Sequence, residues 1–354
     1  MRPKFGLITV ILATIAFFWI VDIFLARVER REMQSEARHD AAQGEALLAA
    51  GHADGAVDQL RKAQAIDRDN SNYALEMAQA LIADGKLDEA GSMLGDTLEQ
   101  MPNNGEANLL EARLMVHRGN LQQAESYYHR AIYGIWGQNP ELQRIRVRLE
   151  LAELLASLHS NQELLAELIP LEAEAEHDLA VRQQVAGLYI EAGAANRAVT
   201  AYRALIRDDP EDGRNYAGLG EAQLALGNYR DAQTAFQNAI RHRDDVRPRL
   251  DLATRLAELD PTPRYLSAAT KFARSNAILE LARDTLARCA TSDQAQKLID
   301  SADQLLSPKV KGPITNEMAE DRLAMAQTIW EFRSDSCGKS PDETLSLLMN
   351  KLSQ

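Results

Sequence analysis

The 354-residue sequence predicts an all-α fold, a solenoid of stacked helix pairs that follows one apolar N-terminal helix. Strong helix formers such as alanine, leucine, glutamate, glutamine and arginine are abundant, whereas aromatic residues make up only 5% of the chain. Glycines and alanines recur every 34 positions over much of the sequence, which is typical of repeated helical units. A long apolar stretch at residues 5–26 indicates a separate transmembrane helix.

This apolar stretch is long enough to cross a bilayer, because its 22 residues span roughly 33 Å as a helix. Trp19 lies near the far boundary, where indole rings are often found, and the Asp22 carboxylate can reach that interface. A cleaved signal peptide is the alternative. However, the stretch is longer than a usual signal core and continues into Arg27–Arg31 without a small-residue cleavage site. We therefore expect an uncleaved signal anchor.

Charges on either side of the anchor leave its orientation open. Two basic residues in the short segment 1–4 precede the helix, and three arginines between Arg27 and Arg31 follow it. The positive-inside rule therefore favours neither side. Single-span proteins with a short basic N-terminus most often keep that end in the cytoplasm. We expect the rest of the chain on the periplasmic side of a bacterial inner membrane.

Internal repetition is the strongest pattern in the sequence. A glycine series, and an alanine series that follows each glycine by five positions, both recur at intervals of 34. One interval between glycines is 74, which equals one ordinary unit plus a unit lengthened by six residues. The members of the two series are Gly51, Gly85, Gly119, Gly193 and Gly227, and Ala56, Ala90, Ala124, Ala198 and Ala232.

This pattern resembles the tetratricopeptide repeat, a 34-residue helix pair with small residues at positions eight and twenty and a turn glycine at position fifteen. Small residues let the two helices approach closely, and glycine supplies the backbone freedom that the turn needs. The best match is unit 213–246, with Gly220, Gly227 and Phe236 at characteristic positions. The resemblance implies a right-handed α-solenoid over residues 37–246. Its units are 37–70, 71–104, 105–138, a degenerate unit at 145–178, 179–212 and 213–246.

The degenerate unit has His159 where glycine is expected, and an irregular insertion at residues 133–140 precedes it. Trp136 lies in this insertion. It could anchor a partner, since aromatic side chains are favoured at interface hot spots. The alternative, which we prefer, is that Trp136 packs into the widened joint between two units.

From Arg247 onward the 34-residue register fades, although the helical character persists. We predict five helices here, with a break near Ser275 in the second and a capping-box start at Ser340 and Glu343 for the last. Region 247–354 is interpreted as diverged repeats or a helical cap, with a small separate domain as the alternative. The five predicted helices are 248–259, 263–288, 292–305, 316–334 and 341–352.

The chain has two cysteines, Cys289 and Cys337, which excludes a disulfide framework. The two could pair with each other in an oxidising compartment. Two unrelated, partly buried thiols are the alternative, and we prefer that interpretation.

The sequence offers no catalytic, cofactor-binding or metal site. It has no glycine-rich phosphate loop and no HExxH, CxxC or G-x-S-x-G motif. His117 and His129 share one unit, but we interpret them as surface or groove histidines. The net charge of -13 argues against nucleic-acid binding, and we interpret it as a solvated surface, with complementarity to a basic partner as the alternative. We therefore expect a protein that is not an enzyme.

The resemblance implies that partners lie along the concave face formed by the first helix of each unit. The lysine and asparagine that clamp a peptide carboxylate in some members of the family are missing here. The expected groove is instead an apolar patch ringed by charges, which suits an amphipathic helix or an extended peptide. Its candidate residues are Leu75, Leu109, Leu110, Arg113, Val116, Leu149, Glu150 and Glu153.

These expectations combine into a single-pass membrane scaffold that presents a solenoid to protein or peptide partners in a cell-envelope assembly. An accessory subunit of an export or cytochrome-maturation apparatus would differ only in its client. A lipid or small-ligand binder would need a large enclosed apolar cavity. An enzyme with its active site in residues 247–354 would need a polar cleft in that region.

Overall fold

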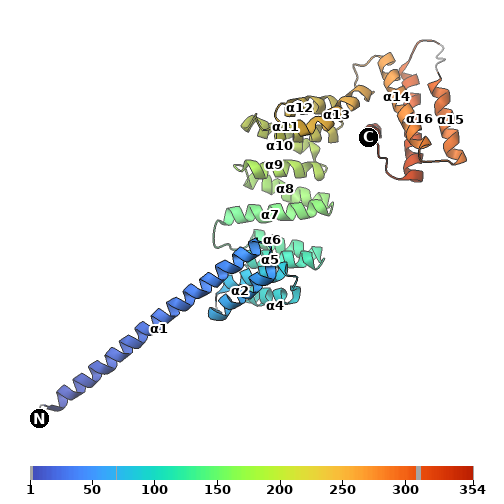
Figure 1. Cartoon of the computed structure of the whole chain (residues 1–354). Helices are drawn as coiled ribbons and strands as arrows, with labels where there is room; N and C mark the ends of the chain where they lie inside the picture. The colour runs from blue at the N-terminus through green and yellow to red at the C-terminus, as the bar shows by residue number, and fades with distance from the viewer. Residues whose placement is uncertain (1–2, 69, 308–311, 354) are drawn as a thin grey trace. The chain divides into compact units, whose positions relative to one another are not determined.

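A computed structural model describes residues 3–68, 70–307 and 312–353, except for the side chains of residues 3–13, 15 and 244. Over these residues the chain folds into seventeen α-helices and one short 3-10 helix, and it contains no β-strand (Figure 1). The predicted all-α solenoid of helix pairs is therefore confirmed. The helices divide into a first unit, residues 1–151, and a second unit, residues 152–354.

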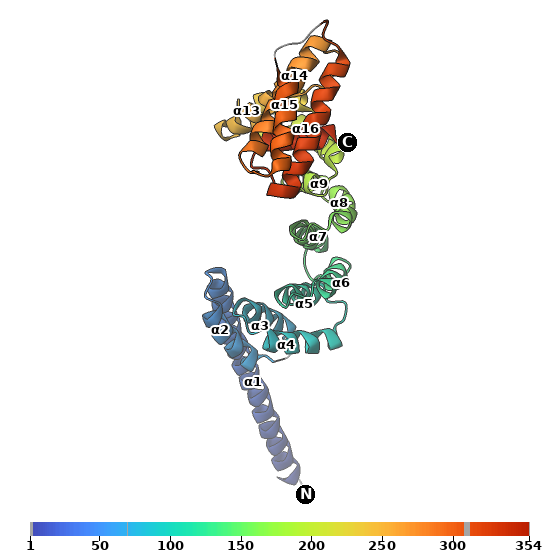
Figure 2. The same cartoon turned by 90° about the vertical axis from the view of Figure 1, so that its right-hand side faces the viewer.

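The first unit is built of helices that pack in chain order. Its elements are α1 (Pro3–Ala49), α2 (Ala53–Ile66), α3 (Ser71–Ala83), α4 (Leu87–Gln100), α5 (Gly105–His117), α6 (Leu121–Ile132) and α7 (Pro140–Ser157), which continues into the second unit. Each helix from α1 to α5 contacts the next, and α3 also contacts both α1 and α5 (Figure 2). The first helices of successive pairs therefore form one layer, and the second helices form another.

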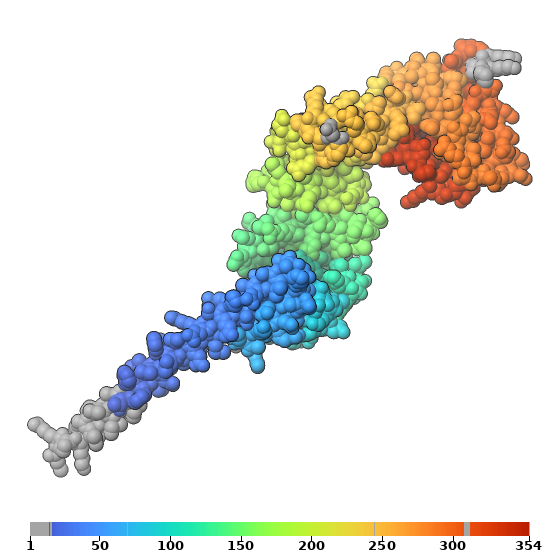
Figure 3. All heavy atoms as spheres, viewed as in Figure 1, coloured from blue at the N-terminus to red at the C-terminus, as the bar shows by residue number. Residues whose placement is uncertain are grey.

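Residues 16–36 of α1 extend away from the repeats of the first unit (Figure 3). These residues are exposed to solvent, apart from the half-buried Val21. Where side chains are described, no helix is both long enough and apolar enough to cross a membrane. Within the expected anchor at residues 5–26, the side chains of residues 5–13 and 15 are outside the described part of the chain. The structure thus gives the expected anchor no support.

The second unit contains the remaining repeats and the C-terminal helices. Its elements after α7 are α8 (Asn161–Glu174), α9 (Leu179–Glu191), α10 (Ala195–Asp208), α11 (Gly213–Ala225), α12 (Tyr229–Ala239), η1 (Asp244–Val246), α13 (Arg247–Leu259), α14 (Ala268–Ala287), α15 (Asp293–Leu306), α16 (Asn316–Cys337) and α17 (Glu343–Leu352). Helices α14, α15 and α16 pack together, and α17 contacts both α13 and α14. One continuous core of buried side chains connects α11 and α12 to α17.

The turn glycines have the backbone that the repeat requires. All five members of the glycine series have φ between 70° and 80°, in the left-handed region that glycine enters without a Cβ clash. His159 replaces glycine in the degenerate unit and has φ of 55°. The degenerate unit therefore keeps the same turn, at the conformational cost that a side chain adds there.

Small residues set the distance between paired helices. All five members of the alanine series are fully buried. In α11, a Cβ on Gly220 would lie 2.6 Å from the ring of Phe236 on α12, and that ring is also fully buried. The two helices approach too closely at this point for even a methyl group.

Two local predictions in the C-terminal region are wrong. Helix α14 begins after Ser267 and continues through Ser275 without a break, because the Ser275 side chain is buried inside the helix packing. Helix α17 begins after Asp342, whose carboxylate accepts the Leu345 N–H at 3.0 Å, so Ser340 is not its N-cap. Asp342 accepts an N–H of the first turn that has no partner within the helix, so α17 starts after this residue.

Cys289 and Cys337 form a disulfide, with Cα atoms 6.1 Å apart. Cys289 follows α14 and Cys337 ends α16, so the bond ties the C-terminal ends of two helices that pack side by side. The preference for two separate thiols is therefore wrong. A separation of 48 residues gives no indication of this pairing until α14 and α16 are packed together.

Helix α17 lies against the end of the last repeat within the second unit. The Tyr229 hydroxyl donates to the Leu347 carbonyl at 2.8 Å. The Lys351 ammonium donates to the Gly227 carbonyl at 2.8 Å and to the Asp260 carboxylate at 2.7 Å. These bonds connect α17 to the turn between α11 and α12 and to the end of α13.

The close packing of α11 on α12 predicts opposite effects for two glycine substitutions. Gly220→Ala should destabilise the chain by about 1–3 kcal/mol, because the new methyl group collides with the buried Phe236 ring. Gly95→Ala is the control, since a Cβ there meets nothing within 4 Å, and it should stabilise α4 by about 0.5–1 kcal/mol. Urea unfolding followed by circular dichroism measures both changes. Equal effects would contradict this account of the packing.

Candidate functional site

The first unit carries a groove of about 660 Å³ lined by α3, α5, α7 and the insertion before α7. Its floor is apolar: Leu109, Leu110 and Val147 are buried, with at most 8% of each residue exposed. Polar and charged side chains from the same three helices surround this floor. The rim consists of Asn72, Glu76, Gln79, Glu106, Arg113, Trp136, Gly137, Gln138, Gln143, Arg146 and Glu150.

An ion pair connects two of the helices that line the groove. The Arg113 guanidinium on α5 donates two hydrogen bonds, of 2.8 and 2.7 Å, to the Glu150 carboxylate on α7. The Tyr128 hydroxyl on α6 donates a third to Glu150, at 2.8 Å. Burial acts to raise the pKa of Glu150, but the bonds from Arg113 and Tyr128 outweigh it and lower that pKa. The Glu150 carboxylate is therefore charged, and its three hydrogen bonds connect α7 to α5 and α6.

Trp136 closes one end of the groove. Its Nε1–H donates to the Ala131 carbonyl at 2.9 Å, and its ring lies where a Cβ on Gly105 would be. The insertion is held by two backbone bonds, from Gly105 N–H to the Ile135 carbonyl at 2.9 Å and from Ile135 N–H to the Asn103 carbonyl at 2.7 Å. The half-buried indole thus packs against the start of α5 while one side of it lines the groove.

Two carboxylates on the rim are poorly compensated. Glu76 on α3 is half-buried, and its buried Oε2 atom accepts no hydrogen bond from the described residues. Burial, repulsion by Glu45 on α1, a hydrogen bond with the Glu45 side chain and repulsion by Glu106 on α5 raise the pKa of Glu76 to about 7. Partial desolvation also raises the pKa of Glu106, which is an exposed residue, although Arg113 opposes the change. The groove therefore contains negative charge that its own cations do not neutralise.

The structure brings together five of the residues expected from the sequence: Leu109, Leu110, Arg113, Trp136 and Glu150 all line the groove. The other four expected residues do not line it. Leu75 is only 2% exposed and packs in the core, while Val116 and Leu149 are half-buried. Glu153 is exposed on the part of α7 that belongs to the second unit.

Several rim residues were missed by the sequence prediction, although a regular spacing marks them. Residues at intervals of three or four on one helix share a face. On each of the inner helices α3, α5 and α7, residues at this spacing line the groove. The series are Asn72, Glu76 and Gln79 on α3, Glu106, Leu110 and Arg113 on α5, and Gln143, Val147 and Glu150 on α7.

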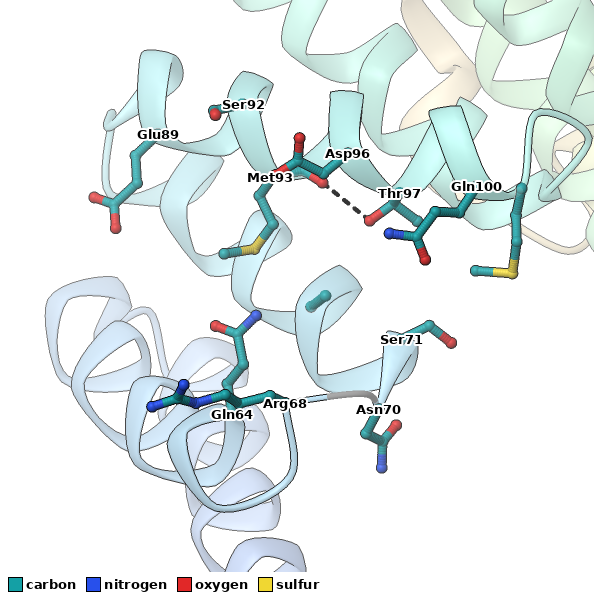
Figure 4. Close-up of a pocket in the computed structure, with 12 residues that line it drawn as sticks. Gln64, Arg68, Asn70, Ser71, Glu89, Ser92, Met93, Asp96, Thr97 and Gln100 are labelled. Atoms are coloured by element: carbon teal, nitrogen blue, oxygen red, sulfur yellow. Dashed lines mark hydrogen bonds between the residues drawn. The ribbon is translucent and has the colours of Figure 1, made fainter.

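A second pocket, of about 440 Å³, lies between α4 and the turn that joins α2 to α3 (Figure 4). Two of its polar groups make local hydrogen bonds. The Thr97 hydroxyl donates to the Met93 carbonyl at 2.9 Å, and the Asn70 side chain accepts the Asn72 N–H at 3.1 Å. Asp69, in the turn itself, lies outside the described residues. We therefore place the candidate site in the groove of α3, α5 and α7.

The stacked helix pairs define an α-solenoid, an architecture consistent with a protein-interaction scaffold. A family model described as Tetratricopeptide repeat matches residues 47–114, 81–133 and 189–256. Over these segments the resemblance inferred from the sequence is confirmed. Such repeats are typically non-enzymatic scaffolds for protein interactions. A search of curated proteins found no match.

The chain is similar to several solved structures at low sequence identity. YrrB, described as a TPR protein with an unusual peptide-binding site, shares 18% identity over 56% of this chain and 97% of its own, with a TM-score of 0.42. PilF of Pseudomonas aeruginosa shares 12% over 72% and 96%, with a TM-score of 0.35. The TPR2AB domain of yeast Sti1, solved with pHSP90, shares 17% over 90% and 99%, with a TM-score of 0.28. Similarities of this size carry no functional argument.

The raised pKa of Glu76 predicts a pH-dependent gain in stability for Glu76→Gln. The folded chain keeps this proton up to about pH 7, whereas the unfolded chain releases it near the ordinary value of 4.5. Stability is therefore lost as pH rises through this range. At pH 8 the uncharged variant should be more stable than wild type by about 1–2 kcal/mol after solvent screening, and at pH 4 the two should be equal.

Thermal unfolding at the two pH values checks this prediction. Glu45 and Glu106 are the charged groups that raise the pKa of Glu76, and Tyr73 on the same helix stays neutral between pH 4 and 8 because its own pKa is raised by burial. Glu99→Gln, at an exposed position of α4 outside the groove, is the matched control and should show no pH-dependent gain. A gain for Glu76→Gln that is the same at pH 4 and pH 8 would contradict the prediction.

Proposed function

We propose that the chain is a scaffold whose first unit binds a peptide segment of a partner protein in the groove of α3, α5 and α7. One observation carries the proposal, the apolar floor of Leu109, Leu110 and Val147 beneath a polar rim. Such a floor accepts apolar side chains of a ligand, and amides such as Gln79 and Gln143 can bond to its backbone.

The rim favours a peptide over a lipid as the ligand. Five charged side chains face the groove, namely Glu76, Glu106, Arg113, Arg146 and Glu150. An acyl chain would remove water from these groups without replacing its hydrogen bonds, which is costly. A peptide supplies backbone and side-chain donors and acceptors at the same positions.

We further propose that residues 5–26 anchor the chain in a bacterial inner membrane, with the repeats on the periplasmic side. Two observations support this proposal. The apolar stretch is as long as a bilayer core is thick. The Cys289–Cys337 disulfide is of a kind that persists in oxidising compartments such as the periplasm. In this location the scaffold would serve a cell-envelope assembly, and an export or cytochrome-maturation apparatus is one such assembly.

Photo-crosslinking tests the groove directly. A benzophenone amino acid at Gln79 or Gln138, both exposed on the rim, should trap a partner in cells of the native host. The same amino acid at Gln122, exposed on α6 outside the groove, should not. Gln79→Trp, which fills the groove, should reduce crosslinking from position 138 about tenfold, whereas Gln122→Trp should leave it unchanged.

Crosslinking that is equal at Gln79, Gln138 and Gln122, or that Gln79→Trp does not reduce, would contradict the proposed site. Identification of the trapped partner by mass spectrometry would also distinguish a general envelope scaffold from an export or cytochrome-maturation subunit.

Fractionation tests the proposed anchor and compartment. In a Gram-negative host, the full-length chain should remain in the membrane pellet after alkaline carbonate washing, and a variant without residues 1–26 should be released. Cys289 and Cys337 should resist maleimide labelling until a reductant is added. Release of the full-length chain, or immediate labelling of both thiols in the unreduced chain, would contradict the membrane and periplasmic proposals respectively.

A further inference from the structure

We propose that the inner face of α11 and α13 is a binding site for an amphipathic helix, and that α17 occupies this site as an intramolecular ligand. The partner is a helix of another protein with the same pattern as α17, which would displace α17 when it binds. This inference concerns the second unit alone, so it goes beyond the peptide groove proposed for the first unit and does not depend on it.

Helix α17 begins on the face of the second unit that corresponds to the groove of the first. Glu221 on α11 is the ninth residue of its repeat unit, as Gln79 on α3 and Arg113 on α5 are of theirs, and those two residues line the groove. The Arg249 guanidinium on α13 donates to Glu221 at 2.6 Å and to Glu343 in the first turn of α17, also at 2.6 Å. The start of α17 therefore lies on the inner helices.

The buried face of α17 has the pattern of a helix that binds in a groove. Leu348 and Met349 follow Leu345 by three and four residues, so the three side chains share one face, and at most 1% of each residue is exposed. They belong to the same apolar cluster as Leu224 of α11 and Leu256 of α13. An amphipathic helix presents anchors at this spacing when it lies in an apolar groove.

Opposite charges at the two ends of α17 fix its direction on this surface. Glu343 in its first turn pairs with Arg249 near the start of α13, and Lys351 in its last turn pairs with Asp260, which directly follows α13. Asp260 is only 5% exposed, so the second pair is largely removed from water. Helix α17 therefore runs parallel to α13. A partner helix needs the same order of an acidic residue, apolar anchors and a basic residue.

The packing around α17 is open on two sides. A pocket of about 160 Å³ lies between α17 and the end of α11, where Leu347 and Leu224 are among its lining residues. Another pocket, of about 450 Å³, is lined by α13, α14 and the start of α17 at Thr344. Protein interiors are usually packed without such gaps. A partner helix with larger apolar side chains can fill these pockets and gain contacts that α17 lacks.

Helix α17 depends on this surface for its helical structure, because it has only 10 residues and isolated helices of this length are marginal in water. The Cys289–Cys337 disulfide holds the start of its linker, residues 338–342, on α14. Each α17 therefore competes for its own site at a high effective concentration. A second copy of the chain is a poor occupant for the same reason, and we assign the site to a helix of another protein.

The test uses a fluorescent peptide with the sequence of residues 338–354, and binding to the full-length chain in detergent is measured by fluorescence anisotropy. In the variant Leu348→Asp a charge replaces a fully buried side chain, so the chain's own α17 should leave the site. The peptide should then bind at least about tenfold more tightly than to wild type. Asn350→Asp is the control. It adds the same charge at an exposed position of α17, and it should bind the peptide as weakly as wild type does.

The ion pair at the end of α17 tests the proposed pattern of the ligand. A peptide with Lys351→Gln should bind the Leu348→Asp chain about tenfold more weakly than the unchanged peptide, the effect of a lost charge-assisted hydrogen bond. Most of this difference should disappear when the chain also carries Asp260→Asn, because the partner carboxylate is absent. The asparagine can still accept the Thr262 N–H. An equal loss on both chains would contradict the proposed orientation.

Four results would overturn the inference. Equally tight binding to wild type and to Leu348→Asp would show that α17 does not occupy the site. A Leu348→Asp chain that keeps its helical circular dichroism but does not bind the peptide would show that the surface accepts no ligand helix. Unfolding of that variant would show that α17 is a fixed part of the core. A wild-type dimer that Leu348→Asp abolishes would assign the site to a second copy. None of these results affects crosslinking from Gln79, so the two proposals fail separately.

Discussion

The structure depends on the close approach of paired helices at small residues. Each pair buries its apolar side only against the next pair, and the five fully buried alanines mark where the helices meet. Gly220 shows how tight this contact is, because a methyl group there would collide with Phe236. The same spacing places α3, α5 and α7 in register. Side chains at equivalent positions of these helices therefore line one groove, and the site follows from the packing.

The repeat could be predicted from the sequence because its requirements act on single residues. A left-handed turn favours glycine, and a close contact between helices requires alanine or glycine. These residues therefore recur at intervals of 34 and can be recognised in the sequence. The disulfide could not be predicted in this way. It depends on α14 packing against α16, and nothing near Cys289 or Cys337 in the sequence records that contact. The start of α17 at Asp342 was missed because several residues nearby can cap a helix.

The candidate site could be predicted only in part. Leu109, Leu110, Arg113, Trp136 and Glu150 lie in the groove, since the repeat register assigns them to inner helices. Leu75 has the same register as Leu109, but it does not line the groove. The carboxylates of Glu76 and Glu106 were not predicted as groove residues, because the sequence does not show which side chains of neighbouring helices line one groove.

The central claim is that the inner helices of the first unit form the binding surface for a peptide. Hydrogen–deuterium exchange of the full-length chain, with and without a peptide selected on it from a random library, tests this claim most directly. The account predicts slower exchange over residues 72–79, 106–113 and 143–150, which contain the groove residues of α3, α5 and α7. Helices α2, α4 and α6 should be unaffected. Protection confined to those outer helices, or to the second unit, would contradict it.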